Sequence, residues 1–123
     1  MRHLVLACML AAASAALAQA NPYEGKWTAK YTTANGNLAQ AEVVVQGMGG
    51  SWDRLGGKAR SDRCTFGAAP IEVASATADE LMFKVLRSQA LQGCTDMQLT
   101  LRRVDDKTLQ GAFGNGIAVE LTR

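Results

Sequence analysis

Apolar and polar residues alternate along nearly every segment of this chain after residue 20. In the range 26–32, for example, Trp27, Ala29 and Tyr31 share one parity, and lysines and threonines occupy the other. Such alternation places apolar side chains on one face of a β-strand and polar side chains on the opposite face. The pattern therefore predicts half-buried strands around a single apolar interior, with no convincing helical stretch.

Short turn-forming sequences separate the alternating segments. Asn35-Gly36 and the Gly-Asn-Gly run at 114–116 are typical of tight hairpin turns, and a further turn is expected over Gly67-Ala68-Ala69-Pro70. The segments predicted to be strands are 26–32, 39–46, 51–55, 71–73, 81–87, 97–102, 109–113 and 117–122. About eight antiparallel strands joined in chain order predict an all-β up-and-down meander that closes into a small barrel, because closure hides the sheet edges. A β-sandwich is the alternative architecture.

The first 20 residues have the organisation of a secretory signal peptide. Residues 1–3 are a short basic start, residues 4–17 are apolar, and residues 18–20 (Ala-Gln-Ala) form a small-x-small cleavage site. The apolar run is too short for stable membrane insertion. We expect cleavage after residue 20, a single barrel domain over residues 21–123, and a periplasmic or secreted location.

Cys64 and Cys94 lie just outside the two arms of the hairpin expected between residues 71 and 87. In an exported chain, two cysteines are best interpreted as one disulfide. The disulfide would join the open end of this hairpin. In the chain-entropy model, closing a loop of about 30 residues stabilises the folded state by about 3.5 kcal/mol.

The expected mature chain carries few residues suited to catalysis. The single histidine, His3, and the third cysteine, Cys8, both lie in the leader. With no histidine and with both remaining cysteines paired, Ser-His-Asp and Cys-His catalysis and Cys/His zinc sites are excluded. The adjacent carboxylates at 79–80 and 105–106 fall in predicted turns and are interpreted as solvated. We expect no enzyme, no cofactor and no metal site, and an enzyme using only carboxylates is the weakest hypothesis.

Charge gives little indication of a polyanionic partner. The leader contains one of the 13 basic residues and none of the 11 acidic residues, so the remaining chain is close to neutral. This balance favours neither nucleic acid nor an anionic membrane. Four basic residues nevertheless gather around the longest predicted loop and form a candidate protein contact: Arg54, Lys58, Arg60 and Arg63.

Several aromatic residues are candidates for lining a ligand site inside the barrel. Tyr31, Phe83 and Phe113 fall on the inward parity, whereas the facing of Trp52 is not determined by the pattern. Arg87 continues the inward parity after Val85, and a buried arginine needs a partner for its charge. It is therefore the best single candidate for holding an anion. The alternative interpretation is that the aromatic residues only fill the core.

Gly25-Lys26-Trp27 forms a Gly-x-Trp motif on the first predicted strand. This motif, in a small exported meander, resembles the calycin group, which includes the lipocalins and avidins. The resemblance implies that Trp27 closes one end of the barrel and that Arg123 packs across its ring, with Arg103 as the second candidate. The chain is also similar to small exported proteins of Gram-negative bacteria.

These observations predict a non-catalytic, monomeric binding protein for a small apolar or amphiphilic ligand held inside the barrel. The alternative partner is a periplasmic protein. In that case the chain would be a protein-binding module, such as an inhibitor of a lysozyme-type hydrolase, that acts through the loop at 56–63. Periplasmic lysozyme inhibitors are also small disulfide-bonded barrels.

Overall fold

A computed structural model of the protein describes residues 21–56, 64–65 and 67–123. The predicted signal peptide at 1–20 lies outside the described residues. The elements are β1 Gly25–Thr32, β2 Leu38–Gln46, β3 Gly49–Leu55, β4 Gly67–Ala76, β5 Glu80–Val85, α1 Arg87–Ala90, β6 Met97–Asp105, β7 Thr108–Phe113 and β8 Ala118–Thr122. In this part of the chain, no helix has the length and apolarity that a membrane span requires.

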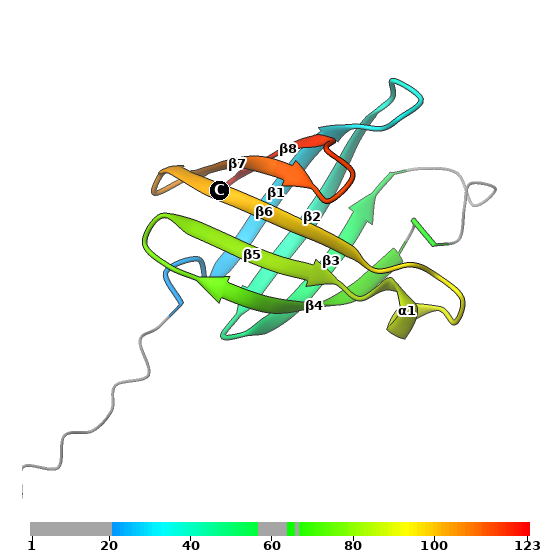
Figure 1. The fold of residues 1–123 in the computed structure, drawn as a ribbon, viewed down its shortest axis with the longest axis horizontal. Coiled ribbons are helices and arrows are strands. Elements are labelled where there is room, and N and C mark those ends of the chain that lie inside the picture. The colour runs from blue at the N-terminus through cyan, green and yellow to red at the C-terminus, as the bar shows by residue number, and fades with distance from the viewer. Residues whose placement is uncertain (1–20, 57–63, 66) are drawn as a thin grey trace, which may run out of the picture.

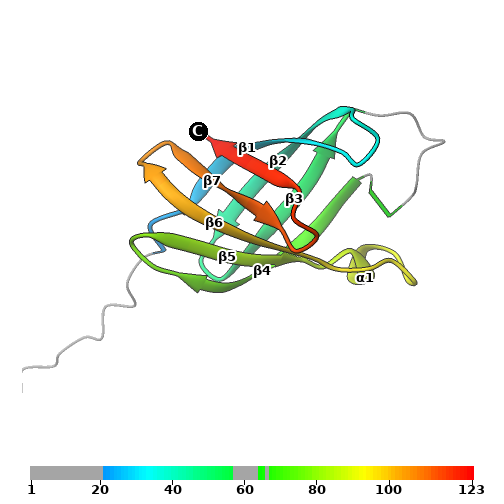
Figure 2. The same ribbon diagram turned by 45° about the horizontal axis from the view of Figure 1, so that its top comes forward.

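Each strand pairs antiparallel with the next, and β8 pairs with β1, so the sheet closes into a barrel. Figures 1 and 2 show the meander running around the barrel in chain order. The ladder between β1 and β8 is short and joins Thr28–Tyr31 to Val119–Thr122. The all-β closed barrel predicted from the sequence is thereby confirmed, and the β-sandwich alternative is wrong.

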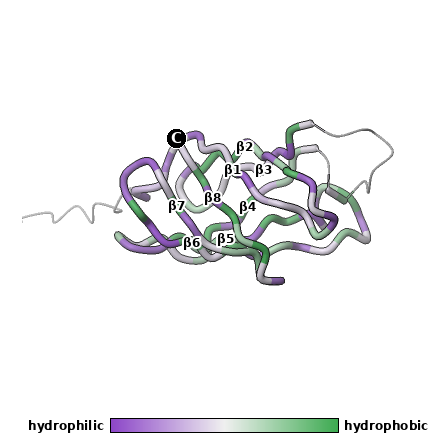
Figure 3. Tube along the Cα trace, turned by 90° about the horizontal axis from the view of Figure 1, so that it is seen from above, coloured by the Kyte–Doolittle hydropathy of each residue, from purple (hydrophilic) through white to green (hydrophobic). Residues whose placement is uncertain are grey.

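The alternation in the sequence corresponds to the two faces of the sheet. On β1, Trp27 and Ala29 are buried, whereas Lys26 and Lys30 are exposed. Buried and more exposed positions alternate in the same way along β2 and β5, and hydrophobic and hydrophilic segments are interspersed along the chain in Figure 3. The inward side chains form one continuous apolar core.

Cys64 and Cys94 form a disulfide, with their Cα atoms 5.3 Å apart. The bond joins the segment before β4 to the segment that follows α1. The predicted pairing is therefore confirmed, and it closes the open end of the β4–β5 hairpin.

Two local predictions are wrong. The turn expected at Gly67–Pro70 is the beginning of β4, where these residues pair with β3. Pro70 is tolerated there because its carbonyl accepts the N–H of Leu86 at 2.8 Å. In a strand, the nitrogen and the carbonyl of one residue point to the same side, so the Pro70 nitrogen points away from β3 and lies beyond the end of β5. The missing N–H of Pro70 therefore removes no β3–β4 hydrogen bond. In addition, the strand expected to reach Arg87 ends at Val85, and Arg87 begins the one-turn helix α1.

Residues 21–24 fold against one end of the barrel, which we call the closed end. Tyr23 is buried there; its carbonyl accepts the indole N–H of Trp27 at 2.9 Å, and its hydroxyl donates to the carbonyl of Thr77. The Asn21 side chain is also buried and donates to the carbonyl of Gly47 at 2.8 Å. These bonds tie the segment before β1 to the β2–β3 and β4–β5 turns.

The last residue completes the closed end. The guanidinium of Arg123 lies over the ring of Trp27, 4.2 Å from its centroid. It also donates to the carbonyls of Glu24 at 3.0 Å and Asp106 at 2.9 Å. Gly25 has a φ of +129°, a conformation that residues with a Cβ rarely adopt. The structure thus brings together the three residues of the predicted closure, whereas Arg103 binds Asp106 instead.

Candidate functional site: the barrel mouth

The opposite end of the barrel contains a cavity of about 530 Å³, which we call the mouth pocket. Its principal lining residues are Tyr31, Arg54, Thr65, Met97, Phe113 and Ile117. They come from β1, β3, the disulfide-linked segment before β4, β6, β7 and the β7–β8 turn. In Figures 1 and 2, α1 and the β1–β2 and β7–β8 turns lie at this end, opposite the β4–β5 and β6–β7 turns.

An aromatic cluster lies beneath and beside the mouth pocket. The rings of Tyr31 and Phe113 meet edge to face, with centroids 4.9 Å apart, and both rings line the pocket. Trp52 packs against them at 6.1 and 5.8 Å, and Phe83 lies 6.2 Å from Trp52. Trp52 and Phe83 are fully buried and do not line the pocket. The predicted aromatic set is therefore gathered in one cluster, with two members at the pocket surface and two as its support.

The indole N–H of Trp52 is buried, and no described residue accepts a hydrogen bond from it. A buried donor left unsatisfied costs about 1–3 kcal/mol. Trp52 is thus a polar exception in an otherwise apolar layer directly behind Tyr31 and Phe113. Its inward facing was not determined by the sequence pattern.

Arg87 is almost completely buried, with 3% of its surface exposed. Its Nη1 donates to the carbonyl of Gly67 at 2.9 Å, and its Nη2 donates to the carbonyl of Thr65 at 3.1 Å. Burial lowers the pKa of the guanidinium. Although the strand ends before Arg87, α1 packs on β4 and turns this side chain under the chain at Thr65 and Gly67. Arg87 supports the rim of the mouth pocket and does not line it.

Arg54 lines the mouth pocket, although the sequence suggested a protein-contact role for it. It is half-buried and lies two residues after the buried Trp52, on the same face of β3. Its neighbours across the ladders are Ala41 on β2 and Gly67 on β4. The other members of the predicted basic cluster, Lys58, Arg60 and Arg63, lie outside the described residues.

Tyr31 is half-buried at the boundary between the aromatic cluster and the pocket. Burial raises the pKa of its hydroxyl, and the positive charges of Arg54 and Arg87 act in the opposite direction. The hydroxyl is consequently protonated at neutral pH and can both donate and accept a hydrogen bond.

One wall of the pocket follows the disulfide. Thr95 and Asp96 come directly after Cys94, and both line the pocket. Asp96 is exposed; its carboxylate accepts from the backbone N–H of Ser88 at 2.9 Å and from the hydroxyl of Ser88 at 2.7 Å. These two hydrogen bonds lower the pKa of the Asp96 carboxyl group. The disulfide and the Ser88–Asp96 bonds therefore hold this wall against α1.

Met97 and Ile117 also line the mouth pocket, although the sequence pattern did not single them out as ligand-lining residues. Both are half-buried and pack against the core while they face the pocket. The available signal was their position: each is the first apolar residue of a predicted strand, on the inward parity. An inward residue at the mouth end of its strand is covered on one side only, and it therefore contributes to the pocket as well as to the core.

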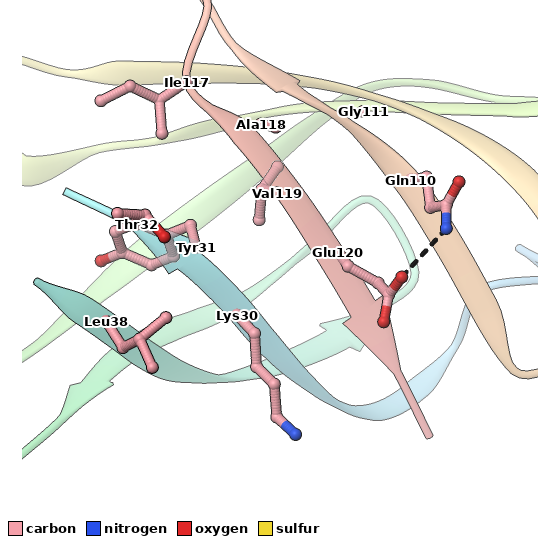
Figure 4. Close-up of a pocket in the computed structure, with 10 residues that line it drawn as sticks. All are labelled: Lys30, Tyr31, Thr32, Leu38, Gln110, Gly111, Ile117, Ala118, Val119 and Glu120. Atoms are coloured by element: carbon pink, nitrogen blue, oxygen red, sulfur yellow. Dashed lines mark hydrogen bonds between the residues drawn. The ribbon is translucent and has the colours of Figure 1, made fainter. Parts of the chain in front are cut away.

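A second hollow, of about 640 Å³, lies on the outer surface where β1 and β8 meet. Most of its side chains occupy outward positions, including Lys30, Leu38 and Glu120 (Figure 4). The Gln110 side chain donates to Glu120 at 3.0 Å, so the amide of Gln110 and the carboxylate of Glu120 are already paired with each other. Of the predicted ligand residues, Tyr31 alone borders it. We therefore treat the mouth pocket as the candidate site.

No protein-family model, no curated protein and no solved structure matches the chain.

Proposed function

We propose that the protein is an exported, non-catalytic binding protein that holds a small, partly apolar ligand in the mouth pocket. The observation that carries the proposal is the cavity of about 530 Å³, walled by Tyr31 and Phe113 at the open end of the barrel. Ligand sites typically enclose about 300–1,000 Å³, with apolar and aromatic walls and a few polar groups. The mouth pocket has this size and this composition.

The architecture supports the same proposal. The interior of an eight-stranded barrel is just wide enough to be filled by side chains or to hold one small ligand. Here Trp27 and Arg123 cover one end, whereas the aromatic cluster stops short of the other. A calycin-like barrel that binds a ligand at its open mouth is consistent with this arrangement. The Cys64–Cys94 disulfide favours an oxidising compartment such as the periplasm.

The polar residues that line the mouth pocket give further support. Ligand pockets orient their occupant through a small number of polar groups placed among apolar ones. Among the described lining residues of the mouth pocket, such groups are carried by Tyr31 and Arg54. A ligand with an apolar body and at least one hydrogen-bond acceptor fits this combination.

The hydrolase-inhibitor hypothesis depends on the loop at 56–63, most of which lies outside the described residues. No described feature favours it over ligand binding, so it becomes an outcome of the experiment. The protein would be purified under oxidising conditions from a bacterial periplasm and analysed by native mass spectrometry. A co-purifying small molecule supports the proposal, whereas a co-purifying hydrolase with an empty barrel contradicts it.

A titration with the neutral fluorescent probe N-phenyl-1-naphthylamine tests the location of the site. We expect Met97→Lys to weaken probe binding by at least about ten-fold, because a charge beside the pocket must be desolvated when an apolar ligand binds. Met82→Lys is the matched control. Met82 is also half-buried, but it lies on the neighbouring strand at an outward position. Equal affinities in the two variants, both confirmed as folded by circular dichroism, would place the probe elsewhere.

A further inference from the structure

Arg54 occupies an inward position at the mouth, where its neighbours leave room for a long side chain. The adjacent residues on β2 and β4 are Ala41 and Gly67, and neither extends beyond a Cβ atom. Arg54 is half-buried as a residue, and it lines the mouth pocket. An arginine on the inner face of a barrel, beside a cavity, is suited to binding a group that enters the cavity.

Among the described residues, the charges that shift the pKa of Tyr31 at the mouth pocket are those of two arginines. Both Arg54 and Arg87 lower the pKa of the Tyr31 hydroxyl through their charges, against the larger effect of burial. The two guanidinium groups repel each other, and the charge of Arg54 therefore lowers the pKa of Arg87. The carboxylate of Asp53 acts on the pKa of Arg87 in the opposite direction. An anion placed near Tyr31 would be attracted by both arginines.

The carboxylate that borders the pocket does not cancel this charge at Tyr31. Asp96 is exposed at the rim, where water screens its charge, and its Oδ1 accepts two hydrogen bonds from Ser88. It is not among the groups that shift the pKa of Tyr31 or Arg87. Of the described residues that line the pocket, Arg54 carries a positive charge on an inward position of β3 and Asp96 carries a negative charge at the exposed rim.

Building on the ligand-binding function proposed above, we propose that the mouth pocket selects amphiphiles with an acidic head group. A carboxylate, sulfonate or phosphate would accept hydrogen bonds from Arg54, while the apolar body lies against Tyr31 and Phe113. Arginine suits this role because its planar donors match such groups in a two-point contact. Arg87 is a positioning residue, since it holds the backbone carbonyl of Gly67, the ladder neighbour of Arg54.

Two related probes test the head group separately from the apolar body. N-phenyl-1-naphthylamine is neutral, and 8-anilinonaphthalene-1-sulfonate carries the same ring system with one sulfonate. We measure both affinities by fluorescence titration of the intact, disulfide-bonded protein, and we compare their ratio between variants. The ratio removes any effect of a substitution on the apolar part of the site.

We expect Arg54→Gln to lower the affinity for the sulfonate probe, relative to the neutral probe, by at least about ten-fold, which corresponds to about 1.4 kcal/mol. The matched control is Arg102→Gln, which removes the same charge from an exposed position on β6 and should leave the ratio within about two-fold. Arg54→Lys retains the charge without the planar fork and should give an intermediate ratio. In the wild type, added salt should weaken the sulfonate probe more than the neutral probe.

The outcomes separate this inference from the function on which it rests. If both probes bind and Arg54→Gln leaves their ratio unchanged, ligand binding stands and the acidic head group is rejected. If Arg54→Gln and Arg102→Gln lower the ratio equally, the preference comes from net charge and the role of Arg54 is rejected. If neither probe binds the wild type, the proposed function fails together with this inference. Should Arg54→Gln not fold, Arg54→Lys and the salt dependence give the same decision.

Discussion

At the scale of single residues, the sequence pattern predicted which side chains face inward but not how much space each position has. Tyr31 and Phe113 were placed at the site by parity alone. Arg54 was not, because the segment at 51–55 is short and follows a glycine-rich run, which leaves its facing ambiguous. The structure resolves this ambiguity through the pairing of Trp52 with Val43 and Ala69, which are also buried.

Gly111 shows a constraint that no pattern in the sequence reveals. It lies on the inward parity of β7, opposite Leu101, in a register where an apolar side chain would be expected. A Cβ atom at this position would come within 1.9 Å of the carbonyl oxygen of Thr100. The backbones of β6 and β7 therefore approach too closely for any other residue.

We expect Gly111→Ala to lower the free energy of unfolding by about 3 kcal/mol, the upper part of the range for overpacked sites. The control is Gly114→Ala, because the nearest atom to a Cβ there is the Gln98 carbonyl oxygen at 3.9 Å. Urea denaturation followed by circular dichroism would measure both variants. Equal midpoints for the two variants would show that the strands can separate at Gly111 without cost.

At the scale of elements, the strands could be predicted because each is long enough to show alternation. The one-turn helix α1 could not, since four residues contain no helical periodicity. The sequence pattern indicated burial of Arg87, the first residue of α1, because Arg87 continues the inward parity of the preceding strand. The strand ends before Arg87, so that reason does not apply. The side chain is buried because α1 packs on β4, where the carbonyls of Thr65 and Gly67 accept its donors.

The contribution of the contact between α1 and β4 to stability can be tested by removing the Arg87 guanidinium. Arg87→Met keeps much of the apolar stem but leaves the carbonyls of Thr65 and Gly67 without their charged donor. We expect a loss of about 1–3 kcal/mol in the free energy of unfolding, since unsatisfied acceptors are costly and the removal of a buried charge offsets part of that cost. Chemical denaturation with the disulfide intact would measure it. Arg102→Met, at an exposed position, should change stability by less than about 0.5 kcal/mol. A similarly small value for Arg87→Met would show that the hydrogen bonds of Arg87 to Thr65 and Gly67 do not stabilise the fold.

At the scale of the whole molecule, closure depends on contacts between the two ends of the described chain. The β1–β8 ladder joins only Thr28–Tyr31 to Val119–Thr122, and Arg123 extends it by stacking on Trp27 and binding the Glu24 carbonyl. The overall closure could be predicted from the number of strands and their short turns. The fold of residues 21–24 against the closed end could not, because its bonds involve side chains and carbonyls distant in the sequence.

We expect Arg123→Met to destabilise the barrel by about 1–2 kcal/mol, from the lost stacking on Trp27 and the lost bonds to the Glu24 and Asp106 carbonyls. Thermal unfolding monitored by tryptophan fluorescence would measure this effect. Binding of N-phenyl-1-naphthylamine at temperatures below unfolding should remain within about two-fold, since Arg123 lies at the opposite end from the mouth pocket. A large loss of probe affinity in the folded variant would argue against the separation of the two ends.

The disulfide places covalent cross-linking on only one side of the rim of the mouth pocket. On one side, the Cys64–Cys94 bond and the Arg87 side chain cross-brace the chain. On the other side, the β1–β2 turn is held by bonds within itself, such as that from the Thr33 N–H to the Asn37 carbonyl at 2.8 Å. For a ligand bound as proposed, we therefore expect the exchange rate to respond to substitutions in the β1–β2 turn more than to reduction of the disulfide.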